Sequence, residues 1–301
     1  MTDHLAAVMA AELALPVDPR VTGMAEALAG KYPDAARGVL FYGSCLRESQ
    51  LDGLMLDFYL IVSSYEAAYG KSWMARANRL IPPNVFPFTH QDQYGELVAK
   101  YAVLDEADFA RLCSMQASDV SVWARFAQPT RLVWVADEAA RARIVDAVTH
   151  APLTLATVTR PMMAEGEGDD PLALWRRGFD LTYSAELRAE RKGRSASIVD
   201  FDPAYYRRLS AALTADGSTL SALSRTDAEA RWASFRRRGK WLTLARLAKA
   251  TGTYAGGIDY LAWKINRHAG TEIAIKPWQR KWPIMGALTM LPKLFRSGAI
   301  K

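Results

Sequence analysis

Apolar side chains along the first half of this 301-residue chain fall into short runs that polar turns separate. The clearest run is 56–62, seven residues rich in branched and aromatic side chains with one charge, Asp57, near its start. Such a run is typical of a buried strand. Similar runs predict three further strands, at 39–42, 97–104 and 130–135.

Helical patterns dominate the residues on either side of these runs. Residues 1–36 predict two helices that flank the core, with a break at Pro16. Residues 141–215 begin with helical patterns and then give two short runs, 180–190 and 195–200, around a turn-like Arg-Lys-Gly-Arg stretch. These two runs predict a two-stranded hairpin. The whole pattern indicates an α/β (α+β) fold class.

A Gly-Ser turn stands between the first two predicted strands and supplies the first chemical signal. Gly43 and Ser44 end one apolar run, and Asp57 opens the next. Backbone N–H groups and a small hydroxyl can contact a triphosphate at such a turn, and a carboxylate can hold its Mg²⁺. An ionised Asp is costly to bury unless a cation pairs with it, so we expect Asp57 at a rim. The pattern predicts a nucleotide-transfer site, with ordinary loop punctuation as the alternative.

Charge is distributed unevenly along the chain. Half of the residues are hydrophobic and 23% are charged, which suits a full core in one large or two ordinary domains. The net charge of +6 combines +13 on residues 231–301 with −7 on the rest. Basic charge so concentrated indicates an anionic partner, either a membrane or nucleic acid.

The last segment, 276–301, favours a membrane over nucleic acid. It carries six basic residues and no acids, interleaved with Trp, Phe, Leu, Ile and Met. Each cation near an anionic lipid surface contributes on the order of 1 kcal/mol, while apolar side chains insert shallowly. Its apolar stretch 282–292 is about eleven residues long, whereas a bilayer span needs roughly twenty. We expect an anchor that lies on the membrane, with a terminal helix packed on the core as the alternative.

Five blocks of sequence occur in an order and spacing that resemble one enzyme family. They are Tyr42-Gly43-Ser44-Cys45, Met55-Leu56-Asp57-Phe58, Lys100-Tyr101-Ala102-Val103, 123–129 and 181–188. Between about residues 40 and 215 the chain resembles the mitochondrial-type phosphatidate cytidylyltransferases, the translocator assembly and maintenance family of CDP-diacylglycerol synthases. Glycines of the family's motifs are replaced here by Cys45, Ala102, Ala124 and Ala185, where conformations that favour glycine could be altered.

The resemblance implies a fold and a reaction. It implies a nucleotidyltransferase-fold core over 1–140, a winged-helix-like domain over 141–230 whose wing is the predicted hairpin, and a basic amphipathic C-terminal region over 231–301. The implied reaction moves a cytidylyl group from CTP to phosphatidate and yields CDP-diacylglycerol and pyrophosphate. Phosphatidate is a phosphomonoester that is already ionised near neutral pH, so no general base is needed. Catalysis then reduces to positioning and charge neutralisation.

The expected site residues follow from these blocks and from the chemistry of the reaction. Asp57 and Glu186 are expected to hold Mg²⁺, with Glu186 in place of the family's Asp, and Ser44 is expected to contact phosphate. The full set expected to bind nucleotide or phosphate is Tyr42, Gly43, Ser44, Arg47, Lys100, Arg125, Tyr183 and Arg188. Simpler roles stay open: the tyrosines could be packing residues, the arginines solvated, and Glu186 an ion-pair partner of Arg188.

Other signals are mostly negative. Cys45 and Cys113 have no metal-binding spacing and suit a reducing compartment. The four histidines are scattered, and no Walker or dinucleotide glycine motif occurs. The opening residues lack a basic start and a long apolar run, so no signal peptide is expected.

We therefore expect a cytoplasmic enzyme, peripheral to the inner membrane. Two alternatives remain: a nucleotidyltransferase acting on a soluble acceptor, and a nucleic-acid-binding protein with an inactive core.

Overall fold

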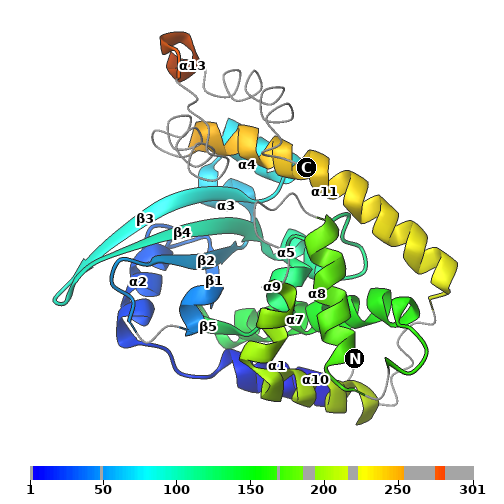
Figure 1. The fold of residues 1–301 in the computed structure, drawn as a ribbon. Helices are drawn as coiled ribbons and strands as arrows, with labels where there is room; N and C mark the ends of the chain where they lie inside the picture. The colour runs from blue at the N-terminus through cyan, green and yellow to red at the C-terminus, as the bar shows by residue number, and fades with distance from the viewer. Residues whose placement is uncertain are drawn as a thin grey trace.

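The computed structural model of the chain describes residues 3–47, 50–167, 170–185, 194–215, 223–253 and 275–281 (Figure 1). At its centre lies a five-stranded sheet in the order β3-β4-β2-β1-β5. The strands are β1 (Ala36–Tyr42), β2 (Met55–Val62), β3 (Asn84–Asp92), β4 (Gly95–Asp105) and β5 (Thr130–Val135). Strands β2 and β4 are parallel, and the other neighbouring pairs are antiparallel. The mixed sheet with its helices confirms the α/β (α+β) class.

The strands predicted at 39–42, 56–62, 97–104 and 130–135 are confirmed, while β3 is a strand that the sequence did not reveal. Pro87 lies in the middle of β3. A proline in an apolar run argues against a strand, because proline has no N–H to donate to a neighbouring strand. Strand β3 tolerates Pro87 because it is at the edge of the sheet, where one side of its backbone needs no partner.

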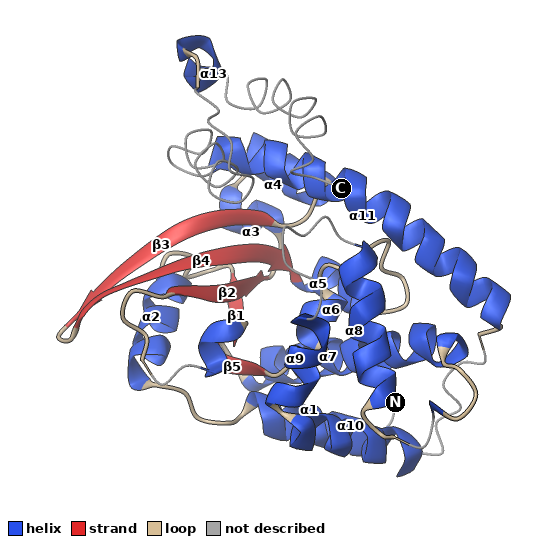
Figure 2. Cartoon of the chain, viewed as in Figure 1, coloured by secondary structure: helices blue, strands red, loops and turns tan. Residues whose placement is uncertain are grey.

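Helices cover both faces of the sheet (Figure 2). One face shares a hydrophobic cluster with α2 (Pro19–Gly30), α3 (Tyr65–Tyr69) and α4 (Trp73–Leu80). The other face shares its cluster with α1 (Asp3–Leu13), α5 (Glu106–Cys113), α6 (Trp123–Phe126), α7 (Glu138–Thr159), α8 (Ala173–Ala185), α9 (Arg194–Phe201), α10 (Pro203–Ala215) and α11 (Arg225–Thr253). The short elements are η1 (Ser44–Arg47), η2 (Arg160–Met162) and α13 (Pro277–Lys281). The two helices expected before the first strand are confirmed as α1 and α2.

The predicted two-stranded wing is wrong. Residues 180–185 form the end of α8, and 194–200 lie in α9. The buried residues of α8 include Trp175, Phe179 and Thr182, spaced by three and four positions, which is the period of a helix face. A strand assignment from so short a run mistook that period for alternation. The helices after β5 share one continuous core with the sheet, because Tyr59, Phe179 and Trp232 belong to the same cluster.

Helix α11 runs diagonally along one side of the molecule and ends beside α4 (Figure 1). It approaches α8 closely at Gly239, where a Cβ would lie 2.3 Å from the carbonyl oxygen of Ala185. None of the helices in the described ranges is both long enough and apolar enough to cross a membrane. Most of the predicted lipid-contacting segment, 282–301, lies outside the described residues.

Candidate functional site

The predicted site residues Tyr42, Asp57 and Lys100 form one row across three neighbouring strands. Tyr42 of β1 is paired with Asp57 of β2, and Asp57 is paired with Lys100 of β4. Residues paired directly across strands project from the same face of a sheet, so these three side chains lie on one surface. The ring of Tyr42 identifies that surface, since its centroid lies 5.2 Å from that of Tyr59 and 6.1 Å from that of Phe126.

Gly43 places its backbone directly against the carboxylate of Asp57. Its φ is +95°, a left-handed conformation that favours glycine. A Cβ at Gly43 would lie 3.2 Å from Asp57 Oδ2. The next residue, Ser44, is exposed and begins the 3₁₀ turn η1. The turn and the carboxylate are therefore neighbours in space, although 14 positions separate Gly43 from Asp57 in the sequence.

Lys100 is the cation that accompanies Asp57. Its Nζ lies 3.2 Å from Asp57 Oδ1, and the side chains of Lys100 and Asp57 are 41% and 19% exposed. This partial exposure agrees with the expected rim position of Asp57. Asp57 Oδ1 is buried and accepts no hydrogen bond from the described part of the chain. Its electrostatic contact with Lys100 therefore leaves it with lone pairs that a ligand could use.

Arg125 joins the row from α6. Its guanidinium donates a hydrogen bond to the backbone oxygen of Ser121 and also hydrogen-bonds the Tyr42 hydroxyl. Burial raises the pKa of the Tyr42 phenol well above its ordinary value; the negative charge of Asp57 adds to that rise, and Arg125 opposes it. Tyr42 is consequently a neutral hydroxyl at any physiological pH. It can hydrogen-bond a ligand but cannot act as a base there.

Asp57 is the one predicted metal ligand that lies among the described residues. The hard carboxylate oxygens of Asp57 suit Mg²⁺. Within the described ranges no group of three or more His, Cys, Asp and Glu side chains could hold a metal ion. Glu186, the expected second ligand, lies outside the described residues, so the two-carboxylate arrangement stays a prediction.

The remaining predicted residues fall into two groups. Arg188 and the side chain of Arg47 lie outside the described residues. Tyr183 of α8 is partly buried and packs against the hydrophobic cluster on the site face of the sheet. This packing agrees with the simpler role left open for Tyr183.

The positions where the family has glycine accept other residues without backbone strain. Among the described residues, no residue other than glycine has a positive φ, and these include Cys45, Ala102, Ala124 and Ala185. Cys45 is buried, and its thiol donates to the backbone oxygen of Met55 at 3.4 Å. That contact ties the Gly43–Ser44 turn to the start of β2.

Three charged residues with buried or partly buried contacts were not predicted from the sequence. Asp119 is only 3% exposed and forms an ion pair with Arg246 of α11, and Lys249 of α11 is buried beside them. Asp119 belongs to no recognised motif, and both cations were counted with the surface charge of the basic region. Only the spacing of Arg246 and Lys249 by three positions, which puts them on one helix face, offered a signal.

No protein-family model matches the chain, and no curated protein matches it. The resemblance noted in the sequence therefore rests on its five motif blocks.

Proposed function

We propose that this protein is a Mg²⁺-dependent nucleotidyltransferase that moves a cytidylyl group from CTP to phosphatidate. The observation that carries the proposal is the contact of the Gly43 backbone with the Asp57 carboxylate, beside Lys100. This arrangement brings a phosphate-binding turn, a metal-binding oxygen and a cation to one place. The choice of cytosine and of phosphatidate comes from the family resemblance.

Each side chain of the site has a role in binding the triphosphate. Backbone N–H groups of the Gly43–Ser44 turn and the Ser44 hydroxyl bind the β and γ phosphates. Lys100 acts as a point charge, and Arg125 suits bidentate contact with phosphate oxygens. Asp57, together with Glu186, would hold Mg²⁺, which neutralises charge on the leaving pyrophosphate.

The acceptor needs no general base at this site. An ionised phosphate oxygen of phosphatidate attacks the α phosphorus of CTP. The bond from that phosphorus to the bridging oxygen breaks, and pyrophosphate leaves with the electron pair. Tyr42 supports this route, because its raised pKa keeps the hydroxyl protonated as a hydrogen-bond partner. Positioning two anions in line accounts for most of the catalysis.

A membrane-resident substrate agrees with the surface of α11. Arg236, Arg237, Arg238 and Lys240 are exposed there, next to Trp241, which is 75% exposed. Basic side chains with an interfacial Trp suit anionic headgroups. The proposed location is the cytoplasmic face of the inner membrane, with the protein attached peripherally.

The first test measures pyrophosphate release from each of the four ribonucleoside triphosphates with vesicles that contain phosphatidate. We expect release with CTP and loss of release in Asp57→Ala. Asp200→Ala is the matched control, because Asp200 also forms an ion pair, with Arg176, on the more distant helix α9. Equal release from the wild type and Asp57→Ala would remove Asp57 from the mechanism.

The exposed arginines also keep a nucleic-acid partner open as the competing function. Sedimentation with anionic vesicles and retention of oligonucleotides, each followed against salt, separate the two. We expect the wild type to bind vesicles, and the combined Arg236→Gln, Arg237→Gln and Arg238→Gln variant to bind them several-fold more weakly. Tight oligonucleotide binding that falls steeply with salt, without pyrophosphate release, would favour the nucleic-acid function. Turnover of a short-chain phosphatidate or a sugar phosphate, but not of vesicles, would favour a soluble acceptor.

A further inference from the structure

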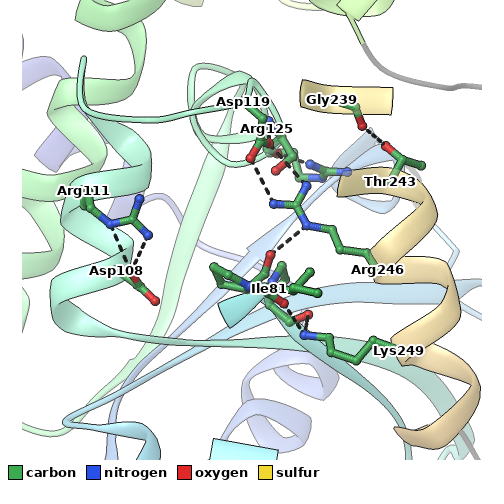
Figure 3. A network of polar contacts seen from close by, with 12 residues as sticks. Ile81, Asp108, Arg111, Asp119, Arg125, Gly239, Thr243, Arg246 and Lys249 are labelled. Atoms are coloured by element: carbon green, nitrogen blue, oxygen red, sulfur yellow. Dashed lines mark hydrogen bonds and ion pairs between the residues drawn. The ribbon is translucent and has the colours of Figure 1, made fainter. Parts of the chain in front are cut away.

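Side chains of α11 contact two other segments of the chain: residues 81–83, which precede β3, and Asp119, which precedes α6 (Figure 3). The guanidinium of Arg246 pairs with both oxygens of Asp119, at 3.1 and 3.3 Å, and its Nε donates to the Pro82 oxygen at 2.7 Å. Lys249 Nζ donates to the backbone oxygens of Ile81 and Pro83, the latter at 2.8 Å. Two basic side chains thus hold α11 on the connection between α4 and β3, and Arg246 also holds Asp119.

Both carboxylate oxygens of Asp119 have hydrogen-bond partners. It is 3% exposed, and one of its oxygens also accepts the Ser121 backbone N–H at 2.8 Å. Burial by itself raises the pKa of Asp119, but the charge and hydrogen bonds of Arg246, together with hydrogen bonds from Ser121, outweigh burial and hold that pKa below its ordinary value. A buried charge with this many partners fixes its surroundings, because any displacement breaks several bonds at once.

The contacts of Asp119 continue without a gap to the site. Asp119 holds the N–H of Ser121, and the backbone oxygen of Ser121 accepts a hydrogen bond from Arg125. Arg125 then hydrogen-bonds Tyr42, which is paired with Asp57 across the sheet. Figure 3 shows Arg125 and Arg246 approaching Asp119 from different elements. A shift of Arg246 would therefore be felt by the guanidinium expected to meet the triphosphate.

We propose that Asp119 and Arg246 are positioning residues that aim Arg125 at the bound nucleotide. This inference rests on the proposed function. It also connects α11, most of which lies within the basic C-terminal region, to the site through Asp119. Arg246 acts through the Asp119–Ser121 turn. Lys249 lies on the same helix but contacts residues 81 and 83 and not that turn. Lys249 is therefore the matched control for loosening of α11 in general.

The test compares Arg246→Met, Arg246→Lys, Asp119→Asn, the double variant Asp119→Asn/Arg246→Met, and Lys249→Met in the full chain. Steady-state kinetics give KM for CTP and kcat on phosphatidate vesicles. Nitrogen-15 NMR of arginine side chains reports the order of the Arg125 Nε–H group without any turnover, and Arg125→Lys assigns that signal. Thermal unfolding identifies any variant that fails to fold.

We expect Arg246→Met to raise KM for CTP about tenfold and to broaden or shift the Arg125 signal, since small misplacements of binding groups are costly. Asp119→Asn should do the same, and the double variant should be no worse than either, because both residues act through one contact. Arg246→Lys should restore part of the affinity. Lys249→Met should leave KM and the Arg125 signal close to the wild type.

Two results would overturn the inference. One is an unchanged Arg125 signal in folded Arg246→Met. The other is an equal rise of KM in Lys249→Met, which would assign the effect to seating of the whole helix. If the wild type releases no pyrophosphate from any triphosphate, the proposed function fails, and the NMR comparison still decides whether the pair positions Arg125.

Discussion

Two carboxylates of this protein, Asp57 and Asp119, have very different surroundings. Asp57 is 19% exposed, contacts one partly exposed lysine, and has a buried oxygen that accepts no hydrogen bond from the described residues. Asp119 is 3% exposed and is bound through both oxygens by Arg246 and by a backbone N–H. Buried polar atoms without a partner are rare in proteins and require a reason. An under-partnered Asp57 is suited to a ligand, whereas a saturated Asp119 is suited to holding structure.

The largest expected effect is on activity. Asp57→Asn should lower kcat/KM by about 10³-fold or more, near 4 kcal/mol of transition-state stabilisation. The same change should alter the free energy of unfolding by less than about 1 kcal/mol, because the ion pair with Lys100 is partly exposed. Kinetics and denaturant unfolding measure the two effects. A large loss of stability in Asp57→Asn would make Asp57 a second structural carboxylate and end the contrast.

Asp119→Ala, in contrast to Asp57→Asn, should have its main effect on stability. It leaves Arg246 with an uncompensated charge at a site where only 18% of its side chain is exposed. We expect a loss of about 3 kcal/mol in the free energy of unfolding. Arg176→Ala, which removes a partner of the more exposed Asp200, should cost well under that amount and serves as the control. Equal losses in these two variants would mean that burial of Asp119 adds nothing.

Because of Lys249, the stability of the folded protein should depend on pH. Burial, followed by the nearby charge of Arg246, lowers the pKa of Lys249 from 10.5 to about 7. Between these pH values the unfolded chain binds the proton and the folded chain releases it, so stability rises with pH. The slope is about 1.4 kcal/mol per pH unit at most. Unfolding measured from pH 7 to 10 should show this rise in the wild type but not in Lys249→Met. If stability changes with pH equally in both proteins, Lys249 stays charged in the folded protein.

A change at Gly43 should cost less stability than the change at Asp119. Gly43→Ala puts a Cβ at a φ of +95° and within 3.2 Å of Asp57 Oδ2. We expect a cost of about 1 kcal/mol in stability, with a fall in kcat/KM that is larger than this cost implies. Gly53→Ala is the control, because Gly53 also has a positive φ, +74°, but a Cβ added there would meet nothing within 4 Å. If both variants lose activity equally, strain rather than contact with Asp57 is responsible.

The sequence predicted Tyr42, Asp57 and Lys100 as site residues, but not the contact between Asp119 and Arg246. Gly43 and Asp57 stand in local patterns, a Gly-Ser turn and the start of an apolar run. Apolar runs of this kind also predicted four of the five strands. Lys100 was expected at the site from the family motif, and its pairing with Asp57 comes from a parallel contact between strands far apart in the chain. Asp119 and Arg246 are 127 positions apart, and neither has a pattern that links it to the other. Long-range pairs of this kind follow from tertiary packing, which local pattern does not encode.

The wrong wing has a different cause. The strand predicted from residue 180 onward includes only the end of α8. It leaves out Trp175 and Phe179, whose spacing from each other and from Thr182 is that of a helix face. These side chains pack into the core.

Proline in β3 has a consequence for how copies of this chain meet one another. An edge strand offers its unpaired N–H and C=O groups as a template for the strand of another molecule. Because Pro87 contributes no N–H, the row of donors along the rim is broken near the middle of β3. This long hairpin is thereby guarded against self-association by sheet extension.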